Sequence, residues 1–218
     1  MKNSTIVLFL SLTFFSCNGQ QTIKLNNMKT FNIKKFEKDL NLRENKNARG
    51  INKDYRWKDT TYEDHDGNII KLSQQGDGNY KEEIRKKNSV YKMVSIFYED
   101  THTLRYEGTY FQDIPVGIEK NYSKEGVLIN EKDNDKISRD MEILTVEDMV
   151  RIMEKKFNID ITKEDELELF AYFEKENKYI CQIVCKPHPE RGDNVYYNYL
   201  FDAKTGDFLS KQIFTIEG

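Results

Sequence analysis

The side chains that could act on a substrate or bind a metal are few and lie far apart in the sequence. The three histidines are His65, His102 and His188, and each falls in a different predicted turn. A zinc site needs several Cys, His, Asp or Glu ligands at characteristic spacings, and none of the histidines has another ligand at such a spacing. The sequence therefore predicts neither a metal site nor a cofactor.

The acidic turn Asp64–Asn68 has the carboxylate density of a calcium-binding loop. An EF-hand loop places Gly sixth and a bidentate Glu twelfth, whereas here Gly67 is fourth and Gln75 is twelfth. The segment Asp133–Asp135 fails the same test, because Leu144 would be the twelfth residue. The dipeptide Asp-Gly is one of the strongest hairpin signals, so we predict a turn and not a calcium site.

Cysteine chemistry is limited as well. Cys181 and Cys185 lie four residues apart on one face of a predicted strand, so at ~3.3 Å per residue their Cα atoms are about 13 Å apart. That separation is beyond disulfide reach, and we expect both to be reduced core residues. The sequence shows no Ser-His-Asp order, glycine-rich phosphate loop or pair of catalytic carboxylates. It therefore predicts a protein that is not an enzyme.

One long connection could contact a partner. Lys186–Asn194 joins two predicted strands that a two-residue turn could have joined, and long loops are either functional or loosely held. The side chains available for binding are Lys186, His188, Arg191 and Asp193. Two prolines restrict the backbone around His188, and Arg191 can make a bidentate contact with a carboxylate. We predict a protein-binding site; the alternative is a solvated hairpin loop without a partner.

The elements that position these residues begin with an export signal. A short positive start precedes an apolar segment that ends at Ser16, too short to span a bilayer and without a stop-transfer flank, so residues 1–16 are predicted to be cleaved. The motif Phe14–Cys17 resembles a lipobox, in which a small residue precedes the lipidated cysteine. The resemblance implies lipidation at Cys17 and a polar tether over residues 17–30. The alternative is an unmodified cysteine after an ordinary signal peptide.

The chain resembles the envelope lipoproteins of Bacteroidetes-like bacteria, and this resemblance implies attachment to the membrane by an N-terminal lipid. No Asp, the residue that retains some lipoproteins at the inner membrane, directly follows Cys17. We therefore expect attachment to the outer membrane, facing the periplasm. The chain has 34 Lys and Arg against 37 Asp and Glu, and this acidic balance argues against a nucleic-acid partner.

The first predicted domain, residues 31–135, is rich in β-strands. Apolar residues three and four apart follow Asn32, which predicts a short helix with Asn32 as its N-cap. A polar loop is expected over Arg43–Lys53. Met93–Asn130 alternates apolar and polar residues between turn-forming residues, which is typical of an antiparallel β-meander.

Within the meander, Tyr98 and Leu104 recur 24 residues later as Tyr122 and Leu128, each pair enclosing a polar turn. The segment Glu107–Leu128 resembles the MORN-type repeats of many bacterial envelope proteins. In those repeats a Gly, an aromatic residue, a Pro-x-Gly turn and a Tyr before an x-Gly-x-Leu turn follow one another. The match covers one good and one degraded copy. It implies a sheet built of hairpins and says almost nothing about activity.

The second predicted domain, residues 141–218, follows a charged linker over Glu131–Asp140. A helix is predicted to begin at Thr145, and four alternating segments follow it, so the helix should cover one face of an antiparallel sheet. The stretch Tyr197–Leu209, with its Asp-Ala-x-Thr-Gly turn, resembles the end of a PepSY domain. The expected fold class is α+β: a MORN-like antiparallel β-meander followed by a small PepSY-like helix-plus-antiparallel-sheet domain.

These features together predict a non-catalytic cell-envelope lipoprotein that binds a protein partner. MORN-like and PepSY-like modules both resemble interaction or inhibitory modules, and small lipoproteins of this kind can serve as immunity proteins against toxins of competing bacteria. The alternatives are a PepSY-type regulator or inhibitor of a peptidase, and a small-ligand carrier or enzyme whose site the sequence does not reveal.

Overall fold

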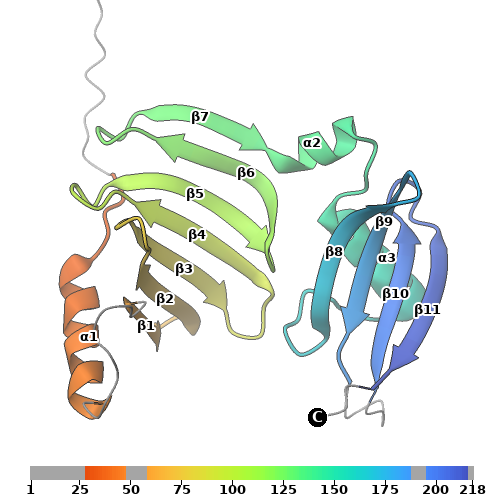
Figure 1. Cartoon of the computed structure of the whole chain (residues 1–218), viewed down its shortest axis with the longest axis horizontal. Coiled ribbons are helices and arrows are strands. Elements are labelled where there is room, and N and C mark those ends of the chain that lie inside the picture. The colour runs from red at the N-terminus through yellow and green to blue at the C-terminus, as the bar shows by residue number, and fades with distance from the viewer. Residues whose placement is uncertain (1–27, 48–57, 188–194, 216–218) are drawn as a thin grey trace, which may run out of the picture.

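The computed structural model describes residues 28–47, 58–187 and 195–215 (Figure 1). Within these ranges, seven strands form one antiparallel sheet, four form a second, and helices α1, α2 and α3 accompany them. The architecture is mixed α+β with antiparallel sheets, as predicted. No helix in the described ranges is long and apolar enough to cross a membrane. The predicted signal peptide, residues 1–16, and the predicted lipidation site, Cys17, lie outside these ranges.

The large sheet is one continuous meander, in which every strand pairs with the next along the chain. Its strands are β1 (Lys58–Glu63), β2 (Asn68–Gln74), β3 (Tyr80–Lys86), β4 (Tyr91–Phe97), β5 (Leu104–Phe111), β6 (Ile114–Tyr122) and β7 (Leu128–Asp133). The meander predicted over Met93–Asn130 is therefore confirmed, and it extends beyond both ends of that range. Strand β3 is too polar for the alternation of apolar and polar residues to predict it from sequence. Its Glu82 forms an ion pair with Lys29, and this pair offsets part of the free-energy cost of placing a charge within the sheet.

The acidic turn at Asp64 builds a hairpin. The Asp64 carboxylate accepts hydrogen bonds from the backbone N–H groups of Asp66 (2.9 Å) and Asn68 (2.8 Å), and Gly67 adopts a φ of +77°. The hydrogen bonds from Asn68 hold the pKa of Asp64 below its ordinary value. The predicted turn is therefore confirmed. The carboxylate oxygens of Asp64 stabilise it by accepting hydrogen bonds from the backbone of the turn itself.

Helix α1 (Ile33–Asn47) begins where the sequence indicates. The side chain of Asn32 accepts a hydrogen bond from the backbone N–H of Lys35 at 3.1 Å, which confirms the N-cap. The prediction of a loop starting at Arg43 was wrong over its first five residues. The helix continues to Asn47 because no Pro or Gly interrupts it, and Leu, Arg and Glu all favour helix.

The last residues of the predicted tether belong to the folded domain. Thr30 forms a β-bridge with Thr103, and the backbone N–H of Leu104 donates to the Lys29 carbonyl at 3.2 Å. Together with α1, this segment closes a small core over one end of the large sheet. The buried members are Phe31, Phe36, Ile70, Leu72, Phe97 and Leu104. A tether extending to residue 30 is therefore too long at its C-terminal end.

The charged linker predicted over Glu131–Asp140 is also wrong. Strand β7 continues to Asp133, and helix α2 (Asn134–Asp140) follows directly. Asp133 is the N-cap of α2, its side chain accepting a hydrogen bond from the backbone N–H of Lys136 at 2.9 Å. A capping carboxylate at the strand end therefore explains why this acidic stretch forms a helix instead of a linker.

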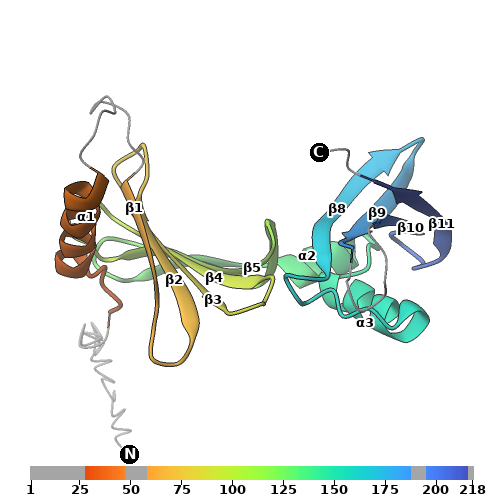
Figure 2. The same ribbon diagram turned by 90° about the horizontal axis from the view of Figure 1, so that it is seen from below.

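The C-terminal part is a helix against a four-stranded sheet, as predicted. Its elements are α3 (Val146–Phe157), β8 (Leu167–Lys175), β9 (Lys178–Cys185), β10 (Tyr196–Asp202) and β11 (Phe208–Phe214), with strand order β11-β10-β9-β8. Figure 2 shows α3 lying along one face of this small sheet, while the opposite face has no described helix or strand over it. The strands β8 and β11 form the two edges.

The two sheets share their largest hydrophobic core. Phe111 of the large sheet is fully buried and makes edge-to-face contacts with Tyr91 and with Phe170 of β8, at centroid distances of 5.0 and 5.1 Å. Val90 and Val116 of the large sheet belong to the same cluster. The segment 141–218 therefore completes its core with residues of the preceding meander.

Polar contacts reinforce this junction. Gln112, in the turn between β5 and β6, accepts a hydrogen bond from the backbone N–H of Phe170 (2.8 Å) and donates to the Glu168 carbonyl (3.1 Å). The pairing of β8 with β9 shifts register between Leu167 and Leu169. The Gln112 amide thus binds β8 next to this irregularity and ties one edge of the small sheet to the large sheet.

Candidate interaction surface

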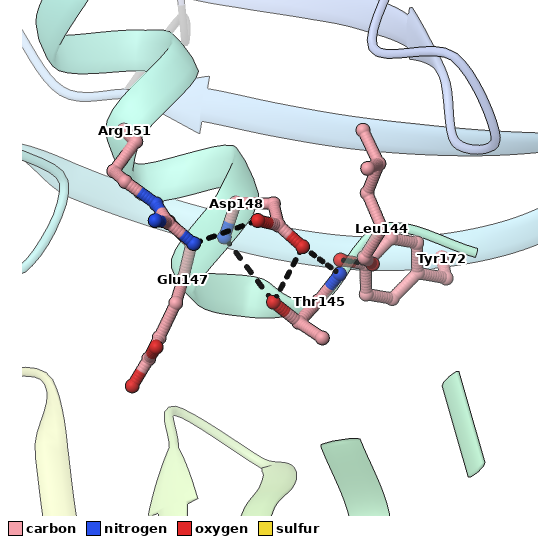
Figure 3. A network of polar contacts seen from close by, with 6 residues as sticks. All are labelled: Leu144, Thr145, Glu147, Asp148, Arg151 and Tyr172. Atoms are coloured by element: carbon pink, nitrogen blue, oxygen red, sulfur yellow. Dashed lines mark hydrogen bonds and ion pairs between the residues drawn. The ribbon is translucent and has the colours of Figure 1, made fainter. Parts of the chain in front are cut away.

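The small sheet is positioned by the first turn of α3 (Figure 3). Thr145 and Asp148 form a capping box: the Thr145 hydroxyl accepts from the backbone N–H of Asp148, and the Asp148 carboxylate accepts from the backbone N–H of Thr145 at 3.0 Å. The Tyr172 hydroxyl of β8 donates to the Leu144 carbonyl at 2.8 Å. These bonds fix where the helix starts and which face of the sheet it covers.

Electrostatics also favour this helix start. Burial raises the pKa of Asp148, but hydrogen bonds from Thr145 and the nearby Arg151 charge outweigh burial and lower the pKa overall. Arg151 contacts the carboxylate at 2.7 Å. Asp148 is therefore ionised at neutral pH, at the helix end where the dipole favours a negative charge.

The cysteines on the helix-facing side of the small sheet are not accessible to solvent or substrate. Cys181 and Cys185 are fully buried there and form no disulfide, as predicted from their spacing. Burial strongly raises the pKa of the Cys181 thiol. A thiol that is buried and protonated is not a nucleophile, so these cysteines are packing residues.

The opposite side of the small sheet has an unusual composition. Register and side-chain alternation place a set of residues on this side, and we call the set the uncharged face: Leu169, Ala171, Phe173, Ile180, Gln182, Val184, Tyr196, Asn198, Leu200, Ser210, Gln212 and Phe214. None of them is charged, although 33% of the whole chain is. A sheet face that simply met water would carry a share of those charges.

Part of the uncharged face is open to solvent, although Ile180 and Val184 near its centre are buried. Leu169 is 42% exposed, Phe173 37% and Phe214 39%, and the rings of Phe214 and Tyr196 stack at a centroid distance of 5.5 Å. No helix or strand in the described ranges covers them (Figure 2). Exposed apolar side chains gathered on one face are characteristic of binding surfaces.

The centre of the uncharged face is a row of amides. The Gln182 amide N–H donates to the Asn198 side-chain oxygen at 3.1 Å, and the Asn198 amide N–H donates to the Gln212 side-chain oxygen at 3.3 Å. The row crosses β9, β10 and β11 in one hydrogen-bonding direction. We call it the amide ladder; it combines donors and acceptors without net charge.

Charges appear only where the uncharged face ends. The alternation of side chains places Lys175, Lys178 and Asp202 beside it at one end and Lys186 at the other. Asp202 is used locally, since its carboxylate accepts from the backbone N–H groups of Lys204 and Thr205 at 2.9 and 3.1 Å. An apolar and amide centre with charges at its margin has the layout of a protein interface.

The predicted partner-binding residues are only partly visible. His188, Arg191 and Asp193 lie outside the described residues. Lys186 is described: its ammonium group donates to the Glu164 carbonyl at 2.8 Å and lies 3.8 Å from the Glu168 carboxylate. Lys186 therefore helps hold the segment before β8.

Tyrosine–carboxylate pairs on the large sheet serve its own structure. The Tyr106 hydroxyl bonds to Tyr110 and Glu119 at 2.7 and 2.8 Å, and the Tyr122 hydroxyl donates to Glu107 at 2.6 Å. Burial and the Glu107 hydrogen bond raise the pKa of Tyr122 to about 12. These hydroxyls are held protonated, so they do not act as bases near neutral pH.

The described histidines lie apart, as their sequence positions suggest. His65 is in the β1–β2 turn, and His102 takes a φ of +56° in the β4–β5 turn, where its ring meets Tyr80. Within the part of the chain that the structure describes, no three His, Cys, Asp or Glu side chains converge on one point as metal ligands would.

Sequence reasoning missed the uncharged face, although a signal was present. Three predicted strands each carry an amide side chain near their centre, at Gln182, Asn198 and Gln212. An amide in a strand is commonplace on its own; what matters here is that strand register brings the three side by side. That register is a property of the tertiary structure.

Comparison with known proteins adds little. No protein-family model matches the chain, and no curated protein matches it. Among solved structures, a candidate lipoprotein from Clostridium difficile 630 overlaps at 13% identity and a TM-score of 0.26, covering 86% of this chain and 95% of that chain. A TM-score this low establishes neither a shared fold nor a shared function. The MORN-like and PepSY-like resemblances therefore stay predictions.

Proposed function

We propose that this chain is a non-catalytic, lipid-anchored protein of the cell envelope that binds a protein partner through the uncharged face. The uncharged face itself carries the proposal. It is a sheet face with exposed apolar side chains at Leu169, Phe173 and Phe214, a central amide ladder and charges only beyond its ends. An apolar, amide-centred surface fits another protein better than it fits a charged ligand or nucleic acid.

The chemistry of the uncharged face defines the partner. Amides offer both donors and acceptors, so the partner must present apolar groups together with uncharged polar groups. A charged partner surface would lose hydration here without gaining an opposite charge. Lys175, Lys178 and Asp202 at one end would then fix the orientation of the partner.

The position of the N-terminal segment fits a membrane anchor. Met28 lies against Gly126 in the β6–β7 turn, at the end of the large sheet remote from the small sheet (Figures 1 and 2). The lipobox-like motif supports lipidation at Cys17, with outer-membrane attachment facing the periplasm. The described part of the chain therefore begins at the end of the large sheet remote from the uncharged face (Figure 1).

The proposal is tested by capture from envelopes, with Leu169→Glu and Phe173→Glu as variants. A buried carboxylate in an apolar contact is strongly unfavourable, so each variant should lose the partner at least tenfold. Ile129→Glu is the matched control, because Ile129 is 64% exposed on β7 and lies outside the uncharged face. Equal capture by all three variants would refute the assignment of this surface.

The identity of the captured protein separates the finer roles. A toxin of a competing bacterium would support an immunity protein, and a peptidase would support a PepSY-type inhibitor or regulator. The anchor is tested independently with Cys17→Ala, which should abolish palmitate labelling and release the protein from membranes. Palmitate labelling that persists in Cys17→Ala would exclude lipidation at this cysteine.

A further inference from the structure

We propose that β11 pairs, antiparallel and edge to edge, with β11 of a second copy of this chain, centred on Gln212. β11 is an edge strand, and such strands present backbone groups that can pair with another strand. Four of its seven residues are large, exposed and apolar, namely Phe208, Leu209, Ile213 and Phe214, at 43%, 49%, 61% and 39% exposure. No described strand or helix covers its outer edge. This dimer does not require the protein partner proposed above.

The other sheet edges carry more charge than β11, although Leu128 and Ile129 of β7 are also exposed, at 45% and 64%. β1 carries Lys58, Asp59 and Glu63, and β7 ends in Glu131, Lys132 and Asp133. Charges on an edge strand oppose pairing with another chain. β8 is occupied at one point by the side chain of Gln112 and has an irregular register there. β11 has a single charged residue, Lys211, whose ammonium group lies over the Tyr197 ring at 3.9 Å.

The amide ladder ends unfinished at this edge. The Gln212 side-chain oxygen accepts from Asn198, but its amide N–H group makes no hydrogen bond within the described part of the chain. The Gln212 residue is exposed, so its amide N–H is accessible to an acceptor on a strand added beside β11. Gln212 of a second copy offers that acceptor and, at the same time, a donor, because a primary amide is self-complementary.

Symmetry then selects the register. A two-fold axis perpendicular to the sheet keeps each side chain on its own face, so a register centred on Gln212 pairs Gln212 with Gln212 of the copy. The same register places Lys211 opposite Ile213 and Ser210 opposite Phe214. A register centred on Lys211 would oppose two like charges, which is destabilising. Only the first arrangement continues the amide ladder without charge repulsion at this position.

The consequence is one eight-stranded sheet with two β8 edges. The two uncharged faces become one continuous surface, since the two-fold axis keeps them on the same side. Identical faces brought side by side usually risk opposing like charges, but the uncharged face has no charged residue near Gln212, and Lys211 lies on the other side of the sheet. A dimer therefore doubles the surface proposed for partner binding.

Variants that place a charge at position 212 test the register. The protein used is the mature chain with Cys17→Ser, so that it carries no lipid and is soluble. Wild type should sediment at twice the monomer mass at high protein concentration. Gln212→Glu and Gln212→Lys should each dimerise about fivefold or more weakly, since each opposes like charges across the axis. A mixture of the two variants should recover the dimer. A wild type that stays monomeric, or a mixture that does not recover, would overturn the proposal.

Cross-linking provides a measurement that does not depend on the charge variants. Directly opposed residues have Cβ atoms about 5 Å apart, so Gln212→Cys should form an intermolecular disulfide under mild oxidation. Phe214→Cys is the matched control on the same strand and face, because its two copies would be about 14 Å apart along the strands. Equal cross-linking of the two variants would contradict the Gln212-centred register. Because these measurements use purified protein alone, their outcome is separate from the capture experiment.

Discussion

Replacing Phe111 with Ala should destabilise the whole described fold and not only the large sheet. Phe111 is fully buried, and its ring packs edge-to-face against Tyr91 of its own sheet and Phe170 of the small sheet. Truncating a buried Phe to Ala costs about 3–5 kcal/mol through lost burial and the cavity left behind. That loss is a large fraction of the roughly 5–15 kcal/mol that stabilises a typical domain.

Urea unfolding followed by circular dichroism measures this cost as a shift of the midpoint at unchanged slope. Hydrogen exchange resolved by peptide should show β4–β6 and β8–β10 losing protection together, because Phe111 belongs to a core that both sheets share. Ile129→Ala is the control: Ile129 is 64% exposed, so the change should stay within about 1 kcal/mol. Separate unfolding of the two sheets, or a Phe111→Ala cost below about 1.5 kcal/mol, would refute a shared core.

Four further outcomes follow from local geometry. Thr145→Ala removes the cap of α3 and should cost about 1 kcal/mol by urea unfolding. Because the pKa of Asp148 is lowered on folding, its contribution is present above the unfolded value near 3.8 and lost as pH falls, so Asp148→Asn should lose less stability between pH 7 and pH 3 than wild type. The raised pKa of Tyr122 has the opposite sign: its contribution is full below pH 10.0 and lost as pH rises through about 12, so Tyr122→Phe should flatten the alkaline loss. Gly206→Ala should destabilise by about 1–2 kcal/mol or more from its φ of +72°, and its Cβ would also lie 2.6 Å from Ile152; an unchanged melting temperature would contradict this.

The predictions that depended on neighbours in sequence were confirmed. The Asp-Gly turn, the Asn32 cap and the capping box at Thr145 each involve residues within four positions of one another. The hydrogen bonds that form them can therefore be predicted from a short stretch of sequence. The meander was recognisable for a similar reason, since alternation has a period of two and each strand pairs with the next. Where local signals were weak, at β3 and α2, the sequence-based assignment missed the element.

The sequence alone determined the α+β class, the antiparallel meander, the buried state of Cys181 and the start of α3. Only the tertiary structure decided that the two sheets share a core at Phe111, because that contact joins residues whose separation in sequence leaves no periodic trace. It alone also decided the candidate site. Strand register brings Gln182, Asn198 and Gln212 into one amide ladder. Whether a sheet face is exposed depends on where all the other elements pack, and the sequence does not show this directly.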